Sequence, residues 1–130
     1  MTLRAIPSVL VVDDHIQSLE VLSSLLSGLG AKSVCRAESA ERALEILQQQ
    51  AFTVIISDYR LEGMDGVQFL EQLRARGDQT PVLLLSGAPD KPAVIRATGY
   101  QKVDFFGKPF DVSEFVGAVE RLTGDKIISE

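Results

Sequence analysis

The chain alternates short apolar runs with longer segments whose apolar residues recur at helical spacing. Runs that are continuously rich in Val, Ile and Leu are typical of strands buried on both faces of a sheet. By this pattern, the expected strands are residues 8–13, 32–37, 52–57, 82–86 and 103–106. The expected helices, with their capping residues, are 16–29, 39–47, 65–77, 90–99 and 111–124. The run at 32–37 is the weakest of the five and is expected at an edge of the sheet.

This order of elements predicts an α/β fold. Successive parallel strands are joined by right-handed crossovers, so the helices pack onto both faces of one sheet. We therefore expect a doubly wound, flavodoxin-like (βα)5 fold, which is a three-layer sandwich around a parallel five-stranded sheet in the order 2-1-3-4-5. Residues 1–130 are expected to form a single domain with its core at about 8–124.

Charge and composition exclude several classes of partner. Thirteen Lys and Arg against 18 Asp and Glu give a net charge of −5, which repels the phosphates of nucleic acids. No apolar stretch approaches the roughly 18 residues that a membrane span needs. The single cysteine, Cys35, cannot form an internal disulfide, which fits a reducing compartment. We therefore expect a cytoplasmic protein that contacts neither nucleic acid nor membrane.

Polar residues gather where the strands end. Asp13 and Asp14 follow the first strand, and Asp58 follows the third. In a sheet of this order the first and third strands flank the point where the winding reverses, which is where ligands bind. Ser86 at the end of the fourth strand and Lys108 just after the fifth reach the same edge.

Three carboxylates in one place need a cation. At about 5 Å and an effective dielectric near 20, each pair repels by roughly 3 kcal/mol. Oxygen ligands with room for water favour Mg²⁺, with Mn²⁺ as the alternative. With that ion and Lys108 the pocket is neutral, and it can still hold the extra charge of an acyl phosphate. Asp58 is then the nucleophile, Lys108 neutralises developing charge, and Ser86 donates to a phosphoryl oxygen.

These residues resemble the receiver domains of two-component response regulators, over about Ser8 to Thr123. The resemblance rests on the order and placement of several short motifs rather than on any one of them. The motifs are Asp13-Asp14, Asp58 with Met64-Asp65-Gly66 downstream, Ser86, Phe105 and Lys108-Pro109-Phe110.

The resemblance implies that a histidine kinase or a phosphotransfer protein phosphorylates Asp58 in a Mg²⁺-dependent reaction. The metal ligands would be Asp13, Asp14, Asp58 and the backbone carbonyl of Arg60. The protein would not be an enzyme in the usual sense, because it would catalyse only its own phosphorylation and dephosphorylation. The resemblance also implies that the Lys108-Pro109 peptide bond is cis.

A conformational switch is the second implication of the resemblance. Ser86 would move toward the phosphoryl group while Phe105 rotates inward, which would change the face made by the fourth helix, the fifth strand and the fifth helix. The partners would be the phosphodonor, a downstream protein or output domain, and a second copy in a phosphorylation-dependent dimer. Phe105 as an ordinary core residue is an equally good interpretation, and Ser86 could be a simple turn residue.

The chain departs from the family's usual pattern near Asp58. Glu62 replaces a frequent Pro, Gly87-Ala88 follow the Ser, and Gln101-Lys102 replace the usual Gly-Ala before the last strand. We hypothesise that Arg60 and Ala88 tune dephosphorylation by controlling how water reaches the phosphorus. Arg60 as a solvated loop residue is the competing interpretation.

Other interpretations remain open at this stage. His15 follows the acidic pair and is expected to be a solvent-exposed residue in the first turn of a helix, with metal ligation as the less favoured alternative. A flavodoxin-like cofactor binder would need phosphate-binding backbone donors after the first strand, where Asp13-Asp14 stand instead. A Mg²⁺-dependent phosphatase and an interaction module that works without phosphorylation are the other two rival functions.

Overall fold

The computed structural model describes residues 8–87, 91–108 and 111–123, which form five strands and five helices in strict alternation. The strands are β1 (Ser8–Val12), β2 (Ser33–Ala37), β3 (Val54–Asp58), β4 (Val82–Ser86) and β5 (Val103–Gly107). The helices are α1 (Ile16–Gly28), α2 (Ala40–Gln49), α3 (Gly66–Ala75), α4 (Lys91–Thr98) and α5 (Val112–Thr123).

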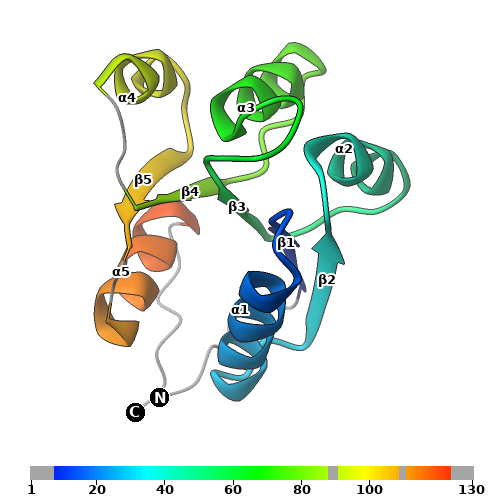
Figure 1. The fold of residues 1–130 in the computed structure, drawn as a ribbon, viewed down its shortest axis with the longest axis vertical. Helices are drawn as coiled ribbons and strands as arrows, with labels where there is room; N and C mark the ends of the chain where they lie inside the picture. Colours follow the sequence, from blue (N-terminus) through cyan, green and yellow to red (C-terminus); the bar gives the residue numbers. More distant parts are fainter. Residues whose placement is uncertain (1–7, 88–90, 109–110, 124–130) are drawn as a thin grey trace.

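The strands form one parallel sheet in the order β2-β1-β3-β4-β5, which confirms the predicted fold (Figure 1). β2 lies at an edge, as its weaker pattern predicted. The order places β1 and β3 side by side, with Val12 of β1 opposite Ser57 of β3. The residues that follow these two strands therefore leave the sheet together at its carboxyl edge.

Helices cover both faces of the sheet. α1 and α5 lie on one face, and α2, α3 and α4 lie on the other (Figure 1). Within β1, Val9 and Val11 pack toward the first pair of helices, whereas Leu10 and Val12 pack toward the other three. Both sets are fully buried, which is why the strand reads as a continuous apolar run rather than an alternating one.

Local capping chemistry sets the starts of three helices as the sequence predicts. The Ser39 hydroxyl accepts a hydrogen bond of 3.0 Å from the Arg42 N–H at the start of α2. Asp65 and Gln68 form a full capping box at α3, with both hydrogen bonds at 2.8 Å. At α5, Asp111 accepts a hydrogen bond of 2.7 Å from the backbone N–H three residues later.

The predicted start of the third strand was wrong by two residues. β3 begins at Val54 rather than at residue 52, and it extends through Asp58. Asp58 is paired in register with Leu85 of β4, and the next backbone N–H, that of Tyr59, donates to the Leu85 carbonyl at 2.8 Å. The pairing with β4 therefore holds Asp58 inside the sheet instead of in the loop that follows.

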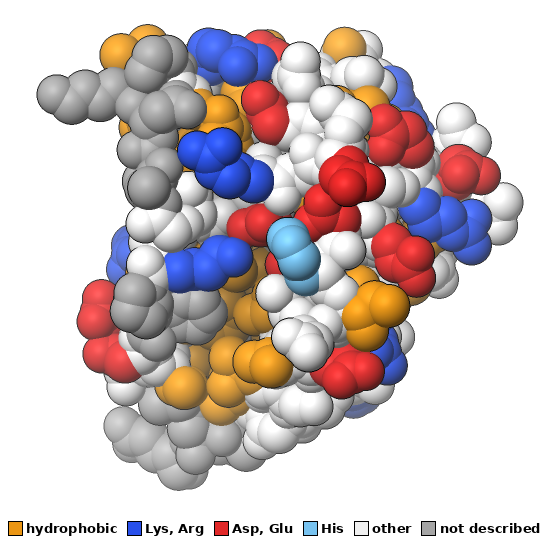
Figure 2. Space-filling model, in the orientation of Figure 1, with side chains coloured by type: hydrophobic (Ala, Val, Ile, Leu, Met, Phe, Trp, Pro, Cys, Tyr) orange, Lys and Arg blue, Asp and Glu red, His pale blue; other side chains and the backbone are white. Residues whose placement is uncertain are grey.

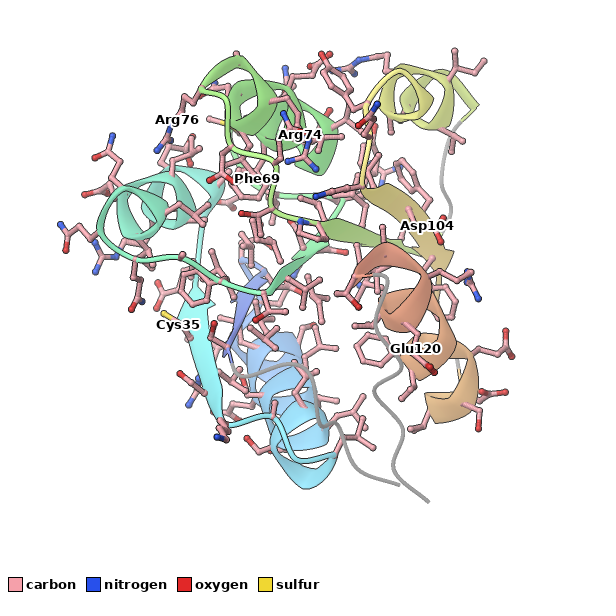
Figure 3. All side chains as sticks on the ribbon, turned by 180° about the vertical axis from the view of Figure 1, so that it is seen from behind. Cys35, Phe69, Arg74, Arg76, Asp104 and Glu120 are labelled. Carbon is pink, nitrogen blue, oxygen red and sulfur yellow. The ribbon has the colours of Figure 1, made fainter. Side chains whose placement is uncertain are left out.

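The connection between α4 and β5 is held by an arginine from α3. Lys102 has a positive φ of 57°, which is unusual for a residue other than glycine. The Arg74 guanidinium donates to the carbonyls of Asp78, Gln101 and Lys102 at 2.9, 3.0 and 3.2 Å (Figure 3). These hydrogen bonds fix the turn in which Lys102 holds its positive φ. Across the described residues, every helix is too short or too polar to cross a membrane.

Candidate functional site

The acidic pair is positioned by the end of β1. The backbone N–H of Asp13 donates to the Ala37 carbonyl of β2 at 3.1 Å, which continues the sheet by one residue and leaves Asp13 only 1% exposed. Asp14 turns out of the sheet, and its Oδ2 accepts a hydrogen bond of 3.1 Å from the backbone N–H of Glu62. The loop after β3 is thereby tied to the loop after β1.

Asp58 meets the cationic end of Lys108. The Asp58 residue is 8% exposed, and its Oδ1 lies 2.9 Å from the Lys108 Nζ. The Lys108 backbone N–H donates to the Ser86 carbonyl at 2.8 Å, which extends the pairing of β4 with β5 beyond the strand end. The sheet itself therefore delivers the ammonium group to the carboxylate.

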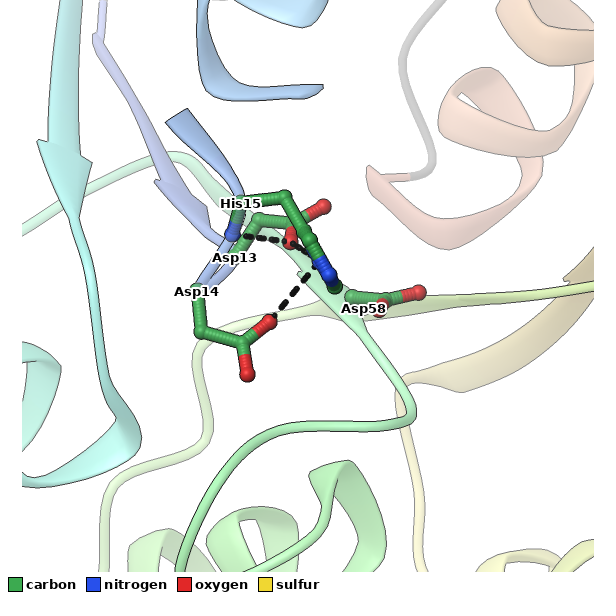
Figure 4. Close-up of side chains that lie close together, drawn as sticks. All are labelled: Asp13, Asp14, His15 and Asp58. Carbon is green, nitrogen blue, oxygen red and sulfur yellow. Dashed lines mark hydrogen bonds and ion pairs between the residues drawn. The ribbon is translucent and has the colours of Figure 1, made fainter. Parts of the chain in front are cut away.

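The three carboxylates converge on one point, as the sequence predicts. Ligand atoms of Asp13, Asp14, His15 and Asp58 all lie within 4.8 Å of one another (Figure 4). Asp14 Oδ1 is buried, and none of the described residues donates a hydrogen bond to it. A buried carboxylate oxygen without a donor is costly unless a cation satisfies it. The donor set of hard oxygens therefore fits a Mg²⁺ ion.

The electrostatics of Asp58 are consistent with a site completed by a cation. Burial raises the pKa of the Asp58 carboxyl above its ordinary value, and the charges of Asp13 and Asp14 push it in the same direction. The hydrogen bond and the charge of Lys108 lower this pKa but do not cancel the effect of burial. A divalent cation at the cluster would favour the ionised, nucleophilic form.

The two residues expected to switch lie on neighbouring strands beside the site. Ser86 ends β4 and is 2% exposed, whereas Phe105 of β5 is half-buried. The Phe105 ring lies 5.9 Å from the ring of Tyr59 at an interplanar angle of 59°. Phe105 thus has core contacts on the α2, α3 and α4 face, and its role as a switch stays a prediction.

The residues expected to tune the site are only partly described. The Arg60 guanidinium carbon lies 6.0 Å from the centre of the Tyr59 ring, a cation–π arrangement that turns the side chain onto its neighbour. Ala88, Pro109 and Phe110 lie outside the described residues, so the tuning role of Ala88 and the cis peptide bond stay predictions.

Two contacts of the site were missed by the sequence analysis. His15 is exposed as expected, but it is the N-cap residue of α1 rather than a first-turn residue, and its Nδ1 faces the acidic pair. The backbone N–H of Glu62 reaches Asp14 from a position 48 residues away. The proximity of His15 to Asp14 in sequence was a usable signal, whereas nothing in the sequence marks the Glu62 amide.

A cavity of about 260 Å³ opens beside the site between α1 and the sheet. The cavity is lined by both site residues and apolar residues. The lining residues are Asp13, Gln17, Ser18, Val21, Leu22, Leu85 and Lys108. Figure 2 shows His15 and acidic side chains near the middle of the visible face, with hydrophobic side chains in a hollow below them. Asp13 and Lys108 of the site thus border a partly apolar opening.

Mg²⁺ is expected to stabilise the fold through the carboxylates. An ion at 100 times its dissociation constant adds about 2.7 kcal/mol to the free energy of unfolding. Asp14→Asn should reduce this gain, because it removes a ligand charge while keeping an oxygen that can accept from the Glu62 N–H. Thermal unfolding with and without Mg²⁺ measures the effect, and Glu20→Gln, an exposed carboxylate on α1, is the control. Equal stabilisation of the wild type and Asp14→Asn would contradict the assignment.

Comparison with known proteins places these features in one family. The model of the response regulator receiver domain matches residues 9–120. The chain is 36% identical over 109 residues to the response regulator protein TodT of Pseudomonas putida, covering 84% of this chain and 48% of TodT. It is 30% identical over 118 residues to the probable chemotaxis protein CheY of Rhizobium etli, covering 89% of this chain and 92% of that protein.

A solved structure gives the same result. The beryllofluoride-activated NtrC4 receiver domain dimer superposes with a TM-score of 0.79 at 25% sequence identity, covering 91% of this chain and 97% of that chain. The chain spans about half the length of TodT and nearly all of the Rhizobium protein.

Proposed function

The chain belongs to the family of response regulator receiver domains, and on that premise we propose that Asp58 accepts a phosphoryl group from a histidine kinase or a phosphotransfer protein. One observation carries the proposal. The buried Asp58 carboxylate has an ammonium group 2.9 Å from one oxygen and lies in a cluster with two further carboxylates. This arrangement suits a nucleophile whose product is a more highly charged acyl phosphate.

In the proposed reaction an Asp58 oxygen attacks the phosphorus of a phosphohistidine. An O–P bond forms, the N–P bond breaks, and the electron pair of that bond returns to the departing imidazole. Lys108 faces Asp58 from 2.9 Å, and its charge neutralises the phosphoryl oxygens as they approach. The Ser86 hydroxyl donates a hydrogen bond to one of those oxygens.

Asp13, Asp14 and Asp58 would hold a Mg²⁺ ion, or Mn²⁺ in its place, together with the backbone carbonyl of Arg60. The ion supplies positive charge to the phosphoryl oxygens. Its +2 charge and the +1 charge of Lys108 balance the three carboxylates. Phosphorylation converts one negative charge into about two, a change that these cations can still accommodate.

We further propose that phosphorylation acts on other proteins through a change of surface. Ser86 and Phe105 are the expected switch, and the face made by α4, β5 and α5 is the expected output. The dimeric state of the beryllofluoride-activated NtrC4 receiver supports phosphorylation-dependent dimerisation as one such output. In this proposal the protein turns over no external substrate and acts in the cytoplasm, where such phosphodonors reside.

Intact-mass analysis after incubation with a small phosphodonor and Mg²⁺ tests the proposal. The expected result is the gain of one phosphoryl group, which fragmentation locates in the peptide that contains Asp58. A chelator should prevent the gain. If the protein acquires no adduct, or acquires one whose site is elsewhere, the phosphoacceptor function is wrong.

Lys108→Ala is expected to slow phosphorylation by roughly tenfold or more, because a hydrogen bond to a charged group is worth about 1.5 kcal/mol or more. The rate of adduct formation with a small phosphodonor measures this. Lys108→Arg retains the charge and should lose less of the rate. Lys102→Ala, at an exposed lysine beyond the site, is the control. A Lys108→Ala variant that reacts at the wild-type rate would remove the lysine from the mechanism.

A further inference from the structure

His15 is turned toward the acidic pair although most of its ring is in solvent. Its backbone N–H donates to Asp13 Oδ1 at 2.9 Å, which folds the chain back and places the ring over the carboxylates. The ring nitrogen Nδ1 lies 3.2 Å from Asp13 Oδ1 and 3.0 Å from Asp14 Oδ1 (Figure 4). The side chain is 72% exposed, so packing does not force this orientation.

In the structure, Nδ1 makes a hydrogen bond to Asp13 Oδ1 and an ion pair with Asp14 Oδ1, and the lengths of these contacts also equal the separation of neighbouring ligands on one metal ion. Metal–nitrogen and metal–oxygen bonds of about 2.1 Å place two adjacent ligands of an octahedral ion about 3 Å apart. Nδ1 is at this distance from both carboxylate oxygens, and Asp58 offers an oxygen within 4.8 Å of all three atoms. Asp14 Oδ1 accepts no hydrogen bond from the described residues, and its 3.0 Å ion pair with Nδ1 forms only with a protonated imidazole.

We propose that His15 Nδ1 is a further ligand of the metal ion held by Asp13, Asp14 and Asp58, and that it raises the affinity for transition-metal ions such as Co²⁺, Ni²⁺ or Zn²⁺ relative to Mg²⁺. The proposal rests on the metal site of the proposed function. Imidazole nitrogen suits these ions, whereas Mg²⁺ prefers oxygen. Metal binding would replace the hydrogen bond from Nδ1 to Asp13: in the tautomer with its proton on Nε2, the Nδ1 lone pair can coordinate, and water can accept from Nε2 of so exposed a ring.

The composition of the chain makes the ligand identifiable. His15 is the only histidine among the 130 residues, so imidazole coordination of a bound metal can come from no other position. A spectroscopic signature of imidazole therefore reports on this one side chain. The wild-type protein alone can show whether Nδ1 coordinates, without any substitution.

Calorimetric titration of the full chain with Co²⁺ and, separately, with Mg²⁺ tests the preference. His15→Gln should weaken Co²⁺ binding by about tenfold or more, because even residues that only support a ligand contribute 10- to 100-fold to metal affinity. The same substitution should weaken Mg²⁺ binding much less, because Mg²⁺ gains little from an imidazole nitrogen. Ser24→Ala, at an exposed position on α1, should alter neither affinity.

Proton NMR of the Co²⁺-loaded wild type provides the second measurement. Strongly shifted imidazole resonances are expected, and they should be absent from His15→Gln. If the wild type binds Mg²⁺ but Co²⁺ affinity is the same in His15→Gln, or no shifted imidazole signal appears, the assignment of His15 is overturned and the phosphoacceptor function stands. If the wild type binds neither ion, the metal site itself is wrong, and the proposed function fails with it.

Discussion

Asp58→Asn is expected to abolish phosphorylation by small phosphodonors altogether. An asparagine side chain has nearly the same shape as aspartate, but its neutral amide is not a nucleophile at phosphorus and cannot form an acyl phosphate. The amide oxygen can still accept from Lys108, which lies 2.9 Å from Asp58 Oδ1, but the negative charge is then missing from the site. Intact-mass analysis should show no added phosphoryl group under conditions that label the wild type fully.

Asp104→Asn is the matched control for this substitution. Asp104 lies on β5, its side chain is 41% exposed, and its ion pair with Arg121 is long at 3.8 Å (Figure 3). Such a surface pair contributes little to stability, so this variant should fold and be labelled like the wild type. If Asp58→Asn is still labelled and Asp104→Asn is not, the assignment of Asp58 as the phosphoryl acceptor is wrong.

Without metal, Asp58→Asn should not be destabilised, and the comparison depends on pH. Burial raises the folded-state pKa of Asp58, so the stability this group contributes is greatest at low pH and is lost as pH rises through that pKa. Asparagine does not titrate. As pH rises from about 4, the free energy of unfolding of the wild type should therefore fall relative to that of the variant. Urea unfolding at several pH values, in the presence of a chelator, measures the difference.

Most of the fold could be predicted because local and global signals agree. The strands are buried on both faces and therefore appear as short continuous apolar runs. The capping residues Ser39, Asp65 and Asp111 mark helix starts by hydrogen bonds that span only three residues. The convergence of Asp13 and Asp58 followed from topology alone, because parallel strands end at one edge of the sheet.

What could not be predicted depends on contacts between distant segments. The amide of Glu62 meets Asp14 only because two loops close over the site, and Arg74 supports the turn at Lys102 from another element. Phe69 of α3 is fully buried. α3 lies between α2 and α4 (Figure 1). Its neighbours therefore cover a larger part of its surface than they would cover on a helix at the edge of the layer.

Gly66→Val is expected to cause the largest loss of stability among the substitutions at this site. Gly66 is the first residue of α3, and its N–H donates to the Tyr59 carbonyl at 2.7 Å. A Cβ at this position would lie 2.8 Å from Leu84 Cδ2 and 3.0 Å from both the Asp58 carbonyl oxygen and the Tyr59 Cα. Overpacking of this kind costs about 1–3 kcal/mol, and a branched side chain belongs at the upper end. Urea unfolding measures the loss.

Gly28→Ala provides the control for this effect. A Cβ at Gly28 meets nothing within 4 Å, and in α1 alanine is favoured over glycine, so the variant should be as stable as the wild type or slightly more stable. A Gly66→Val variant with the stability of the wild type would show that the start of α3 can move away from β3 at little cost.

The contact at Gly66 also couples the fold to the chemistry, because two of the three close atoms belong to the backbone at the end of β3. Leu84 can be shortened, but the Asp58 carbonyl oxygen can be relieved only by moving the residue that carries the proposed nucleophile. In a double-mutant cycle of Gly66→Ala with Leu84→Val, we therefore expect only partial recovery of the lost free energy. Gly66→Ala should be phosphorylated more slowly than the wild type, both with Leu84 and with Leu84→Val. The reason is that the displaced Asp58 carboxylate no longer faces Lys108 at 2.9 Å. Full recovery of both stability and rate would show that the steric clash of the new Cβ is with the Leu84 side chain alone.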